Sequence, residues 1–457
     1  MEQYVPLLKY FNKLITPTSN ETRTRGEVFT PMNIIHKMLD DLPKEVWKDP
    51  SLKWFDPANG IGNFPVCIFL RLMKTLENYK DKNLDLINIE NRRKHILEKM
   101  IYVSELGKTN CLLYNMLMSH GGKYKLNIHN GDSLDLKKIN NKFGFNYFNI
   151  IIGNPPYNTA FSDTSGGASA LYHKFIETYM DHCTYQSFIV PSRWFSGGKG
   201  MGKFRKMMLN RTDIVYIKHF DDASKIFGNS VDIKGGVNYY LKSKNYNGMC
   251  KYNNFDIELN KYDILVEAKF YKIVDKILSK QKLTELYVSS SYSGINTNDK
   301  RLVDTKINDD YLKCYVSKQK GFIKYININD IPQKIRTKRD FNKWKVFTVR
   351  AAHKGNSGFG NIFIGKPMEI SSQSYILFEV HNEEEAKSLE SFLKSRLANF
   401  ILSVRKITQD ISEKTCKWIP LPPLNIIWDD EKLYKHYKLS KIDIELINKT
   451  NIIGFKS

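Results

Sequence analysis

One stretch, residues 150–157 with the sequence IIIGNPPY, limits what this chain can fold into more than any other. The apolar run from Tyr147 to Ile152 is typical of a buried strand. The strand stops at Gly153 and two prolines, because neither a strand nor a helix continues through them. The stretch therefore predicts a rigid loop at the carboxyl end of a strand, which is where open α/β sheets bind their ligands.

The side chains of this loop favour one kind of ligand. The amide oxygen of Asn154 and the carbonyl of Pro155 can each accept a hydrogen bond, and Tyr157 offers an aromatic face. This set suits a flat substrate with an exocyclic amino group, whose two hydrogens are accepted while its ring stacks on the tyrosine. The plain alternative is a turn that follows a strand.

A second motif lies ahead of the first. A strand at 52–55 leads into the loop DPANGIG, residues 56–62, and an apolar helix follows at 66–72. A strand, a glycine turn and a helix open nucleotide-binding α/β domains. The loop lacks the GK[ST] of a phosphate-binding loop, and Asp56 precedes its glycines. An acidic loop repels phosphate and suits a cationic cofactor such as S-adenosylmethionine.

Three other positions complete this expected cofactor site. Thr30, with Phe29 before it and Pro31 after it, is expected to cap a helix whose N-terminus favours an anion such as a carboxylate. Glu105 ends a second strand, where an acid holds ribose hydroxyls. Asp132 follows a third strand and could accept from an adenine amino group. Ordinary capping at Thr30 and an Asx turn at Asp132 are the alternatives.

The rest of the chain predicts further α/β structure and then a change of pattern. A charged helical insertion is expected at 74–99, helices at 108–120, 171–182 and 204–209, and strands at 187–191, 214–217 and 237–241. The glycines at 197–202 are interpreted as a connector. Beyond residue 245 short strands and glycine turns dominate, with one long helix at 383–406. The predicted domains are therefore 1–245 and 246–457.

The amino-acid composition limits the kinds of binding partner and cellular compartment that fit this chain. A net charge of +22 over 457 residues favours a polyanionic binding partner. Some low-GC genomes also inflate the lysine content of their proteins, which would raise this charge without such a partner. The six cysteines lack the spacing of a zinc site or a disulfide scaffold, so we expect no metal and a reducing compartment. No signal peptide and no membrane span are evident in the sequence.

The order of these motifs resembles that of the gamma class of N6-adenine DNA methyltransferases, in type II and type IIG restriction–modification systems. The resemblance covers residues 20–245. Its last motif consists of Phe227 and the sequence VDIKGGV at 231–237. Residues 371–375, 409–412 and 418–422 resemble the target-recognition part of that group. Glu105 stands where the group more often has Asp. Too few residues precede the first motif for the endonuclease domain of type IIG relatives, so no cleavage is expected.

The resemblance implies a Rossmann-like S-adenosylmethionine-dependent methyltransferase domain of the α/β class, followed by a mixed α+β target-recognition domain. It implies methyl transfer to N6 of an adenine flipped out of double-stranded DNA. The expected enzyme is of bacterial, phage or viral origin and acts in the cytoplasm, with a separate cognate restriction endonuclease as a further partner. The implied catalytic residues are Asn154, Pro155, Pro156, Tyr157 and Phe227; the cofactor residues are Phe29, Thr30, Asp56, Ala58, Gly60, Gly62, Glu105, Asp132 and Asn154; and the candidate DNA contacts are Arg193, Arg336, Lys338, Arg339, Arg350 and Lys354.

Two alternatives remain at the level of the sequence. The Asn-Pro-Pro-Tyr loop also serves enzymes that methylate RNA or the glutamine amides of proteins, although those are shorter and usually lack a large basic carboxyl domain. The chain could also be a DNA-binding specificity protein with a decayed methyltransferase core. The intact loop at 154–157 and the Gly60/Gly62 turn argue against decay.

Overall fold

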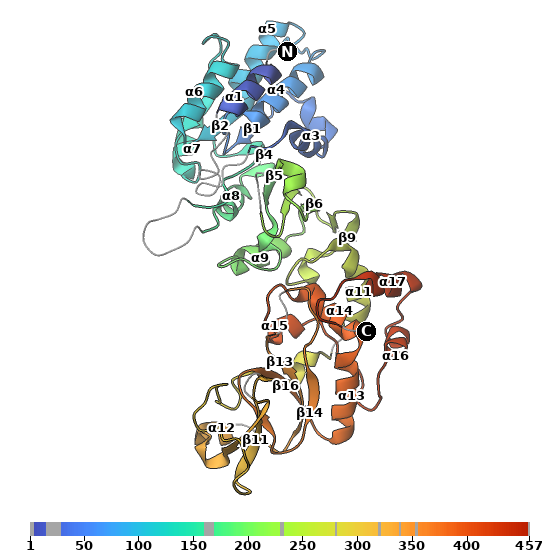
Figure 1. Cartoon of the computed structure of the whole chain (residues 1–457). Coiled ribbons are helices and arrows are strands. Elements are labelled where there is room, and N and C mark those ends of the chain that lie inside the picture. The colour runs from blue at the N-terminus through green and yellow to red at the C-terminus, as the bar shows by residue number, and fades with distance from the viewer. Residues whose placement is uncertain are drawn as a thin grey trace. The chain divides into compact units, whose positions relative to one another are not determined.

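The chain folds into two compact units, Met1–Leu265 and Val266–Ser457 (Figure 1). The computed structural model describes residues 4–14, 29–159, 169–228, 233–278, 281–318, 321–337, 340–351 and 355–455. The division follows Leu265, later than the boundary expected at residue 245. The reason is that two short strands, β8 (Cys250–Tyr252) and β9 (Phe255–Ile257), pair onto the first sheet.

The first unit is built on a nine-stranded sheet in the order β3-β2-β1-β4-β5-β7-β6-β8-β9. Its other strands are β1 (Trp54–Asp56), β2 (Ile101–Glu105), β3 (Asn127–Asn130), β4 (Phe148–Gly153), β5 (Cys183–Pro191), β6 (Ile214–Phe220) and β7 (Val237–Ser243). Strands β3, β2, β1, β4 and β5 run parallel, and β7 is antiparallel to both β5 and β6. The chain moves outward from β1 to β3 and returns on the other side of β1 as β4. The sheet thus has its topological switch point between β1 and β4.

Helices cover both faces of this sheet (Figure 1). They are α1 (Tyr4–Leu14), α3 (Met32–Asp40), α4 (Asn63–Thr75), α5 (Ile89–His95) with a π-helical turn at Ile96–Met100, α6 (Lys108–Met118), α7 (Leu136–Phe143), α8 (Tyr172–Tyr179), α9 (Gly202–Leu209) and α10 (Ser224–Phe227); 3-10 turns lie at Lys44–Trp47, Ser192–Trp194 and Leu259–Lys261. Among the described residues, no helix combines the length and the apolar character that a bilayer span requires.

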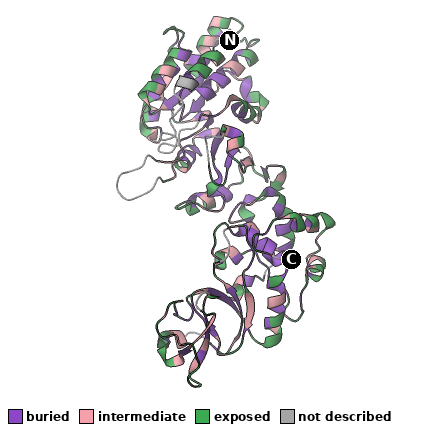
Figure 2. Cartoon of the chain, viewed as in Figure 1, coloured by how far each residue is buried: buried purple, intermediate pink, exposed green. Residues whose placement is uncertain are grey.

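The alternation of side chains along β1 explains the two apolar layers. Trp54 points into the core formed with α1, α3, α4 and α6. The centroid of its ring lies 4.6 Å from that of the Trp47 ring. Phe55 points to the other face and stacks on Phe148 at 4.2 Å, with Tyr179 of α8 edge-on to it. Because successive strand residues face opposite sides, one short strand serves both layers. The buried residues follow the sheet on both sides (Figure 2).

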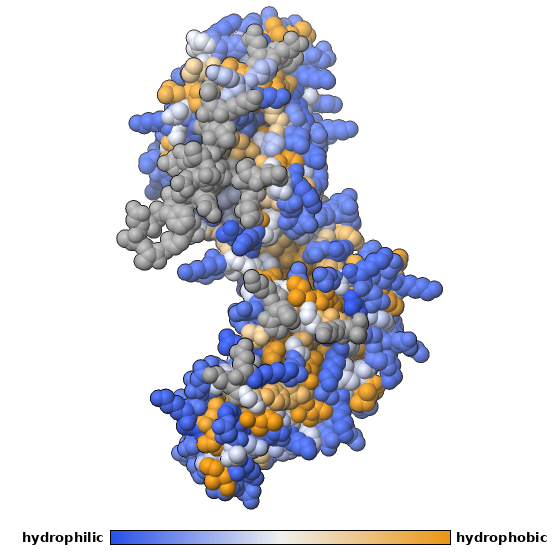
Figure 3. Space-filling model, viewed as in Figure 1, coloured by the Kyte–Doolittle hydropathy of each residue, from blue (hydrophilic) through white to orange (hydrophobic). Residues whose placement is uncertain are grey.

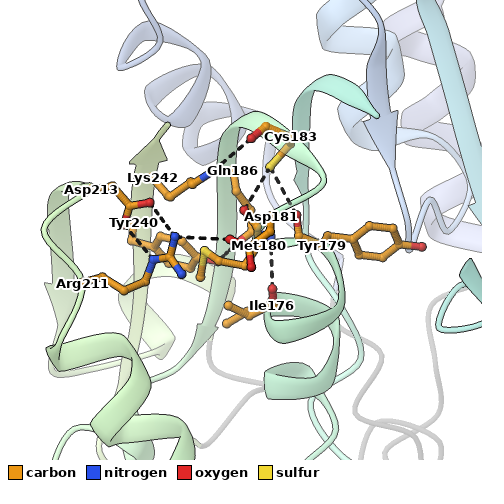
Figure 4. A network of polar contacts seen from close by, with 10 residues as sticks. All are labelled: Ile176, Tyr179, Met180, Asp181, Cys183, Gln186, Arg211, Asp213, Tyr240 and Lys242. Atoms are coloured by element: carbon orange, nitrogen blue, oxygen red, sulfur yellow. Dashed lines mark hydrogen bonds and ion pairs between the residues drawn. The ribbon is translucent and has the colours of Figure 1, made fainter. Parts of the chain in front are cut away.

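A buried polar network ties α8 to strands β5 and β7 (Figure 4). Gln186 of β5 accepts from the Tyr240 hydroxyl at 2.6 Å and donates to the carbonyl of Ile176 at 3.3 Å. The ammonium of Lys242, which is 2% exposed, donates to the carbonyl of Cys183 at 3.0 Å. These bonds satisfy polar groups that would be costly to bury alone, and they fix α8 against the sheet.

Three local expectations are wrong. Helix α3 begins at Met32 after Pro31, and the Thr30 side chain makes no capping bond to it. Of the expected charged helix at 74–99, the first two residues end α4 and the part from Ile89 onward is helical, whereas residues 76–88 form no helix. The expected long helix at 383–406 is two helices, because Ser395 is extended and its hydroxyl caps a new helix by accepting from Ala398 N.

The second unit contains two smaller sheets with a shared apolar core. A four-stranded sheet has the order β10-β16-β13-β14 and a three-stranded sheet the order β12-β11-β15. The strands are β10 (Tyr287–Val288), β11 (Tyr311–Tyr315), β12 (Ile323–Asn327), β13 (Trp344–Val349), β14 (Ile362–Gly365), β15 (Ile370–Ser371) and β16 (Tyr375–Val380). Rings of Tyr315 and Phe363 from the two sheets meet at 4.7 Å.

Helices flank these sheets and form the end of the chain. They are α11 (Tyr271–Ile277), α12 (Gln333–Arg336), α13 (Glu383–Lys394), α14 (Arg396–Arg405), α15 (Glu413–Cys416), α16 (Asp430–His436) and α17 (Lys441–Lys449), with 3-10 turns at Ala268–Phe270, Leu283–Glu285 and Ile328–Asp330. The chain therefore joins a Rossmann-like α/β unit to a mixed α+β unit, which confirms the fold class expected from the sequence.

Candidate functional site

The loops at the carboxyl ends of β1 and β4 lie side by side. Register pairs Phe55 of β1 with Ile151 of β4, so Asp56 and Gly153 leave neighbouring strands together. A Cβ on Gly153 would lie 2.5 Å from the Asp56 carboxylate. Only glycine therefore lets the acidic loop and the IIIGNPPY loop approach this closely.

A cavity of about 500 Å³ opens at this switch point. Its volume lies within the range of small-molecule sites. Loops after β1, β2, β3 and β4 contribute to its wall, together with α8 and the segment before α3. The lining residues that the sequence predicted are Phe29, Thr30, Ala58, Gly60, Glu105, Asp132, Asn154 and Pro156. The structure thus gathers eight of the expected site residues around one cavity, from positions as far apart as 29 and 156.

Glu105 organises the cavity from the end of β2. One of its carboxylate oxygens accepts from Gly60 N at 2.8 Å, and the other accepts from Gly107 N at 2.8 Å and Asn110 Nδ2 at 3.4 Å. The side chain therefore joins the loop after β1 to the start of α6.

The wall is rich in acceptors and lacks cations. Glu105 and Asp132 are its charged groups, and no lysine, arginine or histidine is among its described lining residues. The oxygen atoms Thr30 Oγ1 and Asn59 Oδ1 are buried there without a hydrogen bond to another described residue. Buried oxygens without partners are costly, and a ligand that brings positive N–H groups would satisfy them.

Asp56 adds a buried carboxyl group beside the loop that lines this wall. Its Oδ1 accepts from Ala58 N at 3.0 Å, whereas Oδ2 has no hydrogen-bond partner among the described residues. Burial raises the pKa of Asp56 to about 8, and the carboxylate of Glu105 also raises it, against the lowering effect of the Ala58 hydrogen bond. A carboxyl group in this state binds a proton or a neighbouring cation readily.

Hydrogen bonds among buried hydroxyl groups hold the loop after β1 in place. Ser133 Oγ donates to the carbonyl of Pro57 at 2.5 Å and contacts Ser104 Oγ at 2.8 Å. Ser104 Oγ in turn lies 2.9 Å from His129 Nδ1, and the Tyr179 hydroxyl donates to the carbonyl of Ser133. The loops after β1, β2 and β3 are thus joined to each other and to α8.

Several predicted residues lie away from the wall. Tyr157 is 4% exposed, and burial raises its pKa against a smaller lowering by the Asn154 side chain. Pro155 is buried. Gly62, with φ of 102°, begins α4, where a Cβ would lie 2.5 Å from the Tyr114 ring. Phe227 ends α10 and packs against the core. Their assigned roles stay predictions.

The candidate DNA contacts are dispersed. Arg193 is exposed in the 3-10 turn after β5. In the second unit, Arg336 donates to Asn329 Oδ1 at 3.2 Å, and Arg350 lies 3.8 Å from Asp410. Lys338, Arg339 and Lys354 lie outside the described residues.

The polar residues of the cavity wall that sequence reasoning missed include Asn110 and Ser133. Both were detectable in principle. Asn110 lies on the helix that starts directly after Glu105, and Ser133 adjoins Asp132. Neither forms a recognisable motif, because their partners are a side chain and a backbone carbonyl that the fold alone brings near. Among the described residues, no cluster of three or more His, Cys, Asp or Glu side chains is arranged for a metal ion.

Solved structures of restriction–modification enzymes align with this chain at low similarity. The DNA complex of the type IIL enzyme MmeI aligns at 12% identity with a TM-score of 0.45, over 88% of this chain and 69% of that chain. A modification subunit assigned to a type I restriction enzyme of Vibrio vulnificus YJ016 aligns at 17% identity with a TM-score of 0.39, over 63% of this chain. The present chain spans 60% of the length of that subunit.

Two comparisons of the sequence itself also find relatives. Residues 68–227 match the family model described as Eco57I restriction-modification methylase. An adenine-specific methylase of Mycoplasma pneumoniae, itself uncharacterised, is 26% identical over 315 residues, which covers 53% of this chain and 71% of that protein. The resemblance expected from the motif order is confirmed: the chain is similar to adenine methyltransferases of the restriction–modification type.

Proposed function

We propose that this chain transfers a methyl group from S-adenosylmethionine to the N6 amino group of an adenine in double-stranded DNA. One observation carries the proposal. The acidic glycine loop after β1 and the Asn154 loop after β4 line a single cavity at the switch point of the sheet. A donor and an acceptor of the methyl group can therefore be held within one site.

The cofactor half of the site fits the chemistry of the ligand. S-adenosylmethionine supplies a methyl group that is activated by attachment to a positively charged sulfur. The acceptor oxygens of Thr30 and Asn59 and the charge of Asp56 suit its ammonium group, whereas Glu105 suits its ribose hydroxyls. Asp132, in the same wall, would accept from its adenine amino group. The absence of cations from the described wall residues disfavours a phosphorylated cofactor.

The substrate half rests on Asn154 and its neighbours. The side-chain oxygen of Asn154 and the carbonyl of Pro155 would accept the two hydrogens of the adenine amino group. This draws the nitrogen lone pair out of conjugation with the ring, so that it can bond to the methyl carbon as the carbon–sulfur bond breaks. The nitrogen would then release one of its two hydrogens to solvent as a proton. Positioning and electrostatics then supply the rate enhancement, without a nucleophilic side chain.

The target base must leave the helix to reach this cavity, because the duplex encloses it. Tyr157 and Phe227 are the proposed stacking partners of the extruded base. The Tyr157 ring is buried in the DNA-free chain, so stacking requires the loop to rearrange when DNA binds. The net charge of +22 and the adenine-specific name of the M. pneumoniae relative support DNA as the substrate.

The decisive experiment maps modified bases. A methylation-free bacterial host would express the chain, and methylated adenines would be located in its DNA by sequencing. We expect methylation at one short recurring sequence. Purified protein would also be given a tritiated cofactor with DNA, RNA and protein extracts, and label in RNA or protein alone would overturn the proposal.

Asn154→Ala is the matched test of mechanism. It should lower the rate of DNA methylation about 100-fold or more, as expected when one preorganised hydrogen-bond partner of a transition state is removed. Its protein should fold normally, because the side chain lines a cavity and is not part of the apolar core. Asn141→Ala, an exposed position on α7, should methylate DNA at the native rate. Native activity in Asn154→Ala would contradict the mechanism.

A further inference from the structure

Helix α1 packs against α4 and α6, the two helices whose first turns line the cavity of the first unit (Figure 1). Tyr4, Leu8 and Phe11 are buried along one face of α1. The Tyr4 hydroxyl forms a hydrogen bond with His120 Nε2, and the centroid of its ring lies 5.3 Å from that of Phe69 on α4. These contacts hold α1 in a defined position beside the site.

One side chain near the C-terminal end of α1 reaches the wall of the cavity. Asn12 Nδ2 donates to Oδ1 of Asn63, the first residue of α4, at 3.2 Å. Asn63 is 7% exposed and lines the cavity itself. Its Nδ2 donates to the carbonyl of Thr30 at 3.3 Å. We call Asn12, Asn63 and Thr30, joined by these two hydrogen bonds, the asparagine relay.

The directions of the two bonds favour one orientation of the Asn63 carboxamide. The Thr30 carbonyl can only accept, so Asn63 must present its NH2 group to it. The NH2 group of Asn12 then meets the oxygen of Asn63 on the other side. If the Asn63 amide were reversed, its oxygen would face the Thr30 carbonyl, and two acceptors would meet without a hydrogen between them. Asn12 therefore stabilises the orientation in which Asn63 holds Thr30.

The segment held in this way is the part of the cavity wall that precedes α3. Phe29 and Thr30 both line the cavity, and Thr30 Oγ1 is buried there without a hydrogen bond to another described residue. The other end of α3 is fixed by Asp41, whose two carboxylate oxygens accept from Lys218 Nζ at 2.8 and 2.6 Å. The asparagine relay fixes the end that faces the cavity. A wall that is ordered before a ligand arrives lowers the entropic cost of binding.

From these contacts we propose that Asn12 and Asn63 are positioning residues of the cofactor site. Asn63 holds Thr30 where its hydroxyl oxygen can meet the ligand, and Asn12 acts through Asn63. Helix α1 is then a functional part of the site, although none of its described residues lines the cavity. The inference rests on the proposed function, which identifies the ligand as S-adenosylmethionine.

A double-mutant cycle tests whether Asn12 acts through Asn63. Titration calorimetry without DNA would give the Kd of S-adenosylmethionine for wild type, Asn12→Ala, Asn63→Ala and the double variant. Each single variant should weaken binding about 3-fold to 10-fold, the range of one hydrogen bond. The double variant should bind no more weakly than Asn63→Ala, because Asn12 has then lost the group through which it acts. Effects that multiply in the double variant would overturn the inference.

A substitution of similar size separates positioning from packing. Asn12→Leu keeps most of the side-chain volume but has no donor, so it should weaken binding as much as Asn12→Ala. Weak binding by Asn12→Ala together with native binding by Asn12→Leu would show that only volume matters, which contradicts a relay. Asn115→Ala, an exposed asparagine on α6, is the matched control and should bind with native affinity.

Kinetics give a second readout on the same variants. In DNA methylation, Asn12→Ala should raise the KM for the cofactor by the same factor as its Kd. Its kcat should stay native, because the asparagine relay contacts no reacting atom in the proposed mechanism. A lower kcat with an unchanged KM would contradict the inference. Circular dichroism would check that each variant is folded, and should Asn63→Ala fail to fold, the two Asn12 variants decide alone.

The binding data also keep this inference distinct from the proposed function. If the wild-type protein binds no S-adenosylmethionine, the proposed function fails, and the inference fails with it. If the wild type binds the cofactor and Asn12→Ala and Asn12→Leu bind it equally well, the proposed function stands and the asparagine relay does not position the site.

Discussion

At the scale of the residue, the most informative group is the Asp56 carboxyl. The hydrogen bond from Ala58 N stabilises the charged form of this carboxyl group. Burial and the nearby carboxylate of Glu105 destabilise that form. The balance raises its pKa to about 8, so the cofactor-free protein holds a neutral acid at physiological pH. A cation beside it would reverse this preference, so the same residue can serve as an electrostatic anchor for a positively charged ligand.

This shift predicts how stability depends on pH. The folded carboxyl keeps its proton up to about pH 8, whereas the unfolded one releases it near pH 4. The folded state therefore binds more protons in this window, and Asp56 contributes a stability that is lost as the pH rises. Asp56→Asn keeps the acceptor for Ala58 N but does not titrate. The free energy of unfolding of wild type relative to Asp56→Asn should fall from pH 5 to pH 8, by at most about 1.4 kcal/mol per pH unit.

Urea denaturation at several pH values, without cofactor, measures this difference. Parallel curves for the two proteins would show that Asp56 titrates normally. Calorimetry adds an independent readout, because binding of S-adenosylmethionine to the wild type below pH 8 should release a proton. Asp56→Asn should bind the cofactor more weakly and release none at this position.

At the scale of the element, the start of α4 shows how packing constrains a motif. Gly62 is a predicted cofactor residue, and the structure packs it against Tyr114 of α6. Its φ of 102° is disfavoured for any residue with a Cβ, and a Cβ there would lie 2.5 Å from the Tyr114 ring. The second glycine of the DPANGIG loop thus lets two helices approach, while Gly60 lies in the cavity wall.

Gly62→Ala should therefore destabilise the first unit. Overpacking and the left-handed backbone together should cost about 1–3 kcal/mol in the free energy of unfolding. Gly202→Ala on α9 is the control, because its Cβ would meet nothing within 4 Å and its φ is not positive. The control should leave stability unchanged or raise it slightly. Equal stability of Gly62→Ala and wild type in urea would show that the helix start can adjust.

At the scale of the whole molecule, charge and division into units bear on DNA binding. The surface of both units carries many hydrophilic side chains (Figure 3). The net charge of +22 belongs to the entire chain and includes 70 lysine and arginine residues against 48 acidic ones. Such an excess favours release of counterions when DNA binds.

Binding to duplex DNA should consequently weaken steeply with salt. A protein that makes six to ten phosphate contacts loses roughly 10³-fold to 10⁵-fold in affinity between 50 and 200 mM salt. Fluorescence anisotropy on an unrelated duplex would measure this term without sequence recognition. A salt-independent affinity would show that the charge is compositional and that DNA is not the polyanion it serves.

The sequence by itself determined the parts of the site that follow strands. Asp56, Glu105, Asp132 and Asn154 each end a strand or begin its loop, and carboxyl ends of parallel strands meet at one edge. Local patterns also determined the apolar alternation that gives Trp54 and Phe55 opposite faces, and the change of pattern that marks the second unit.

The tertiary structure decided what depends on distant partners. Only the fold shows that Gly153 must admit the Asp56 carboxylate, that Ser133 bonds to Pro57, and that β8 and β9 extend the first sheet. Burial of Tyr157 and the break at Ser395 also arise from packing. These contacts join residues far apart along the chain, and no local pattern encodes which pairs will meet.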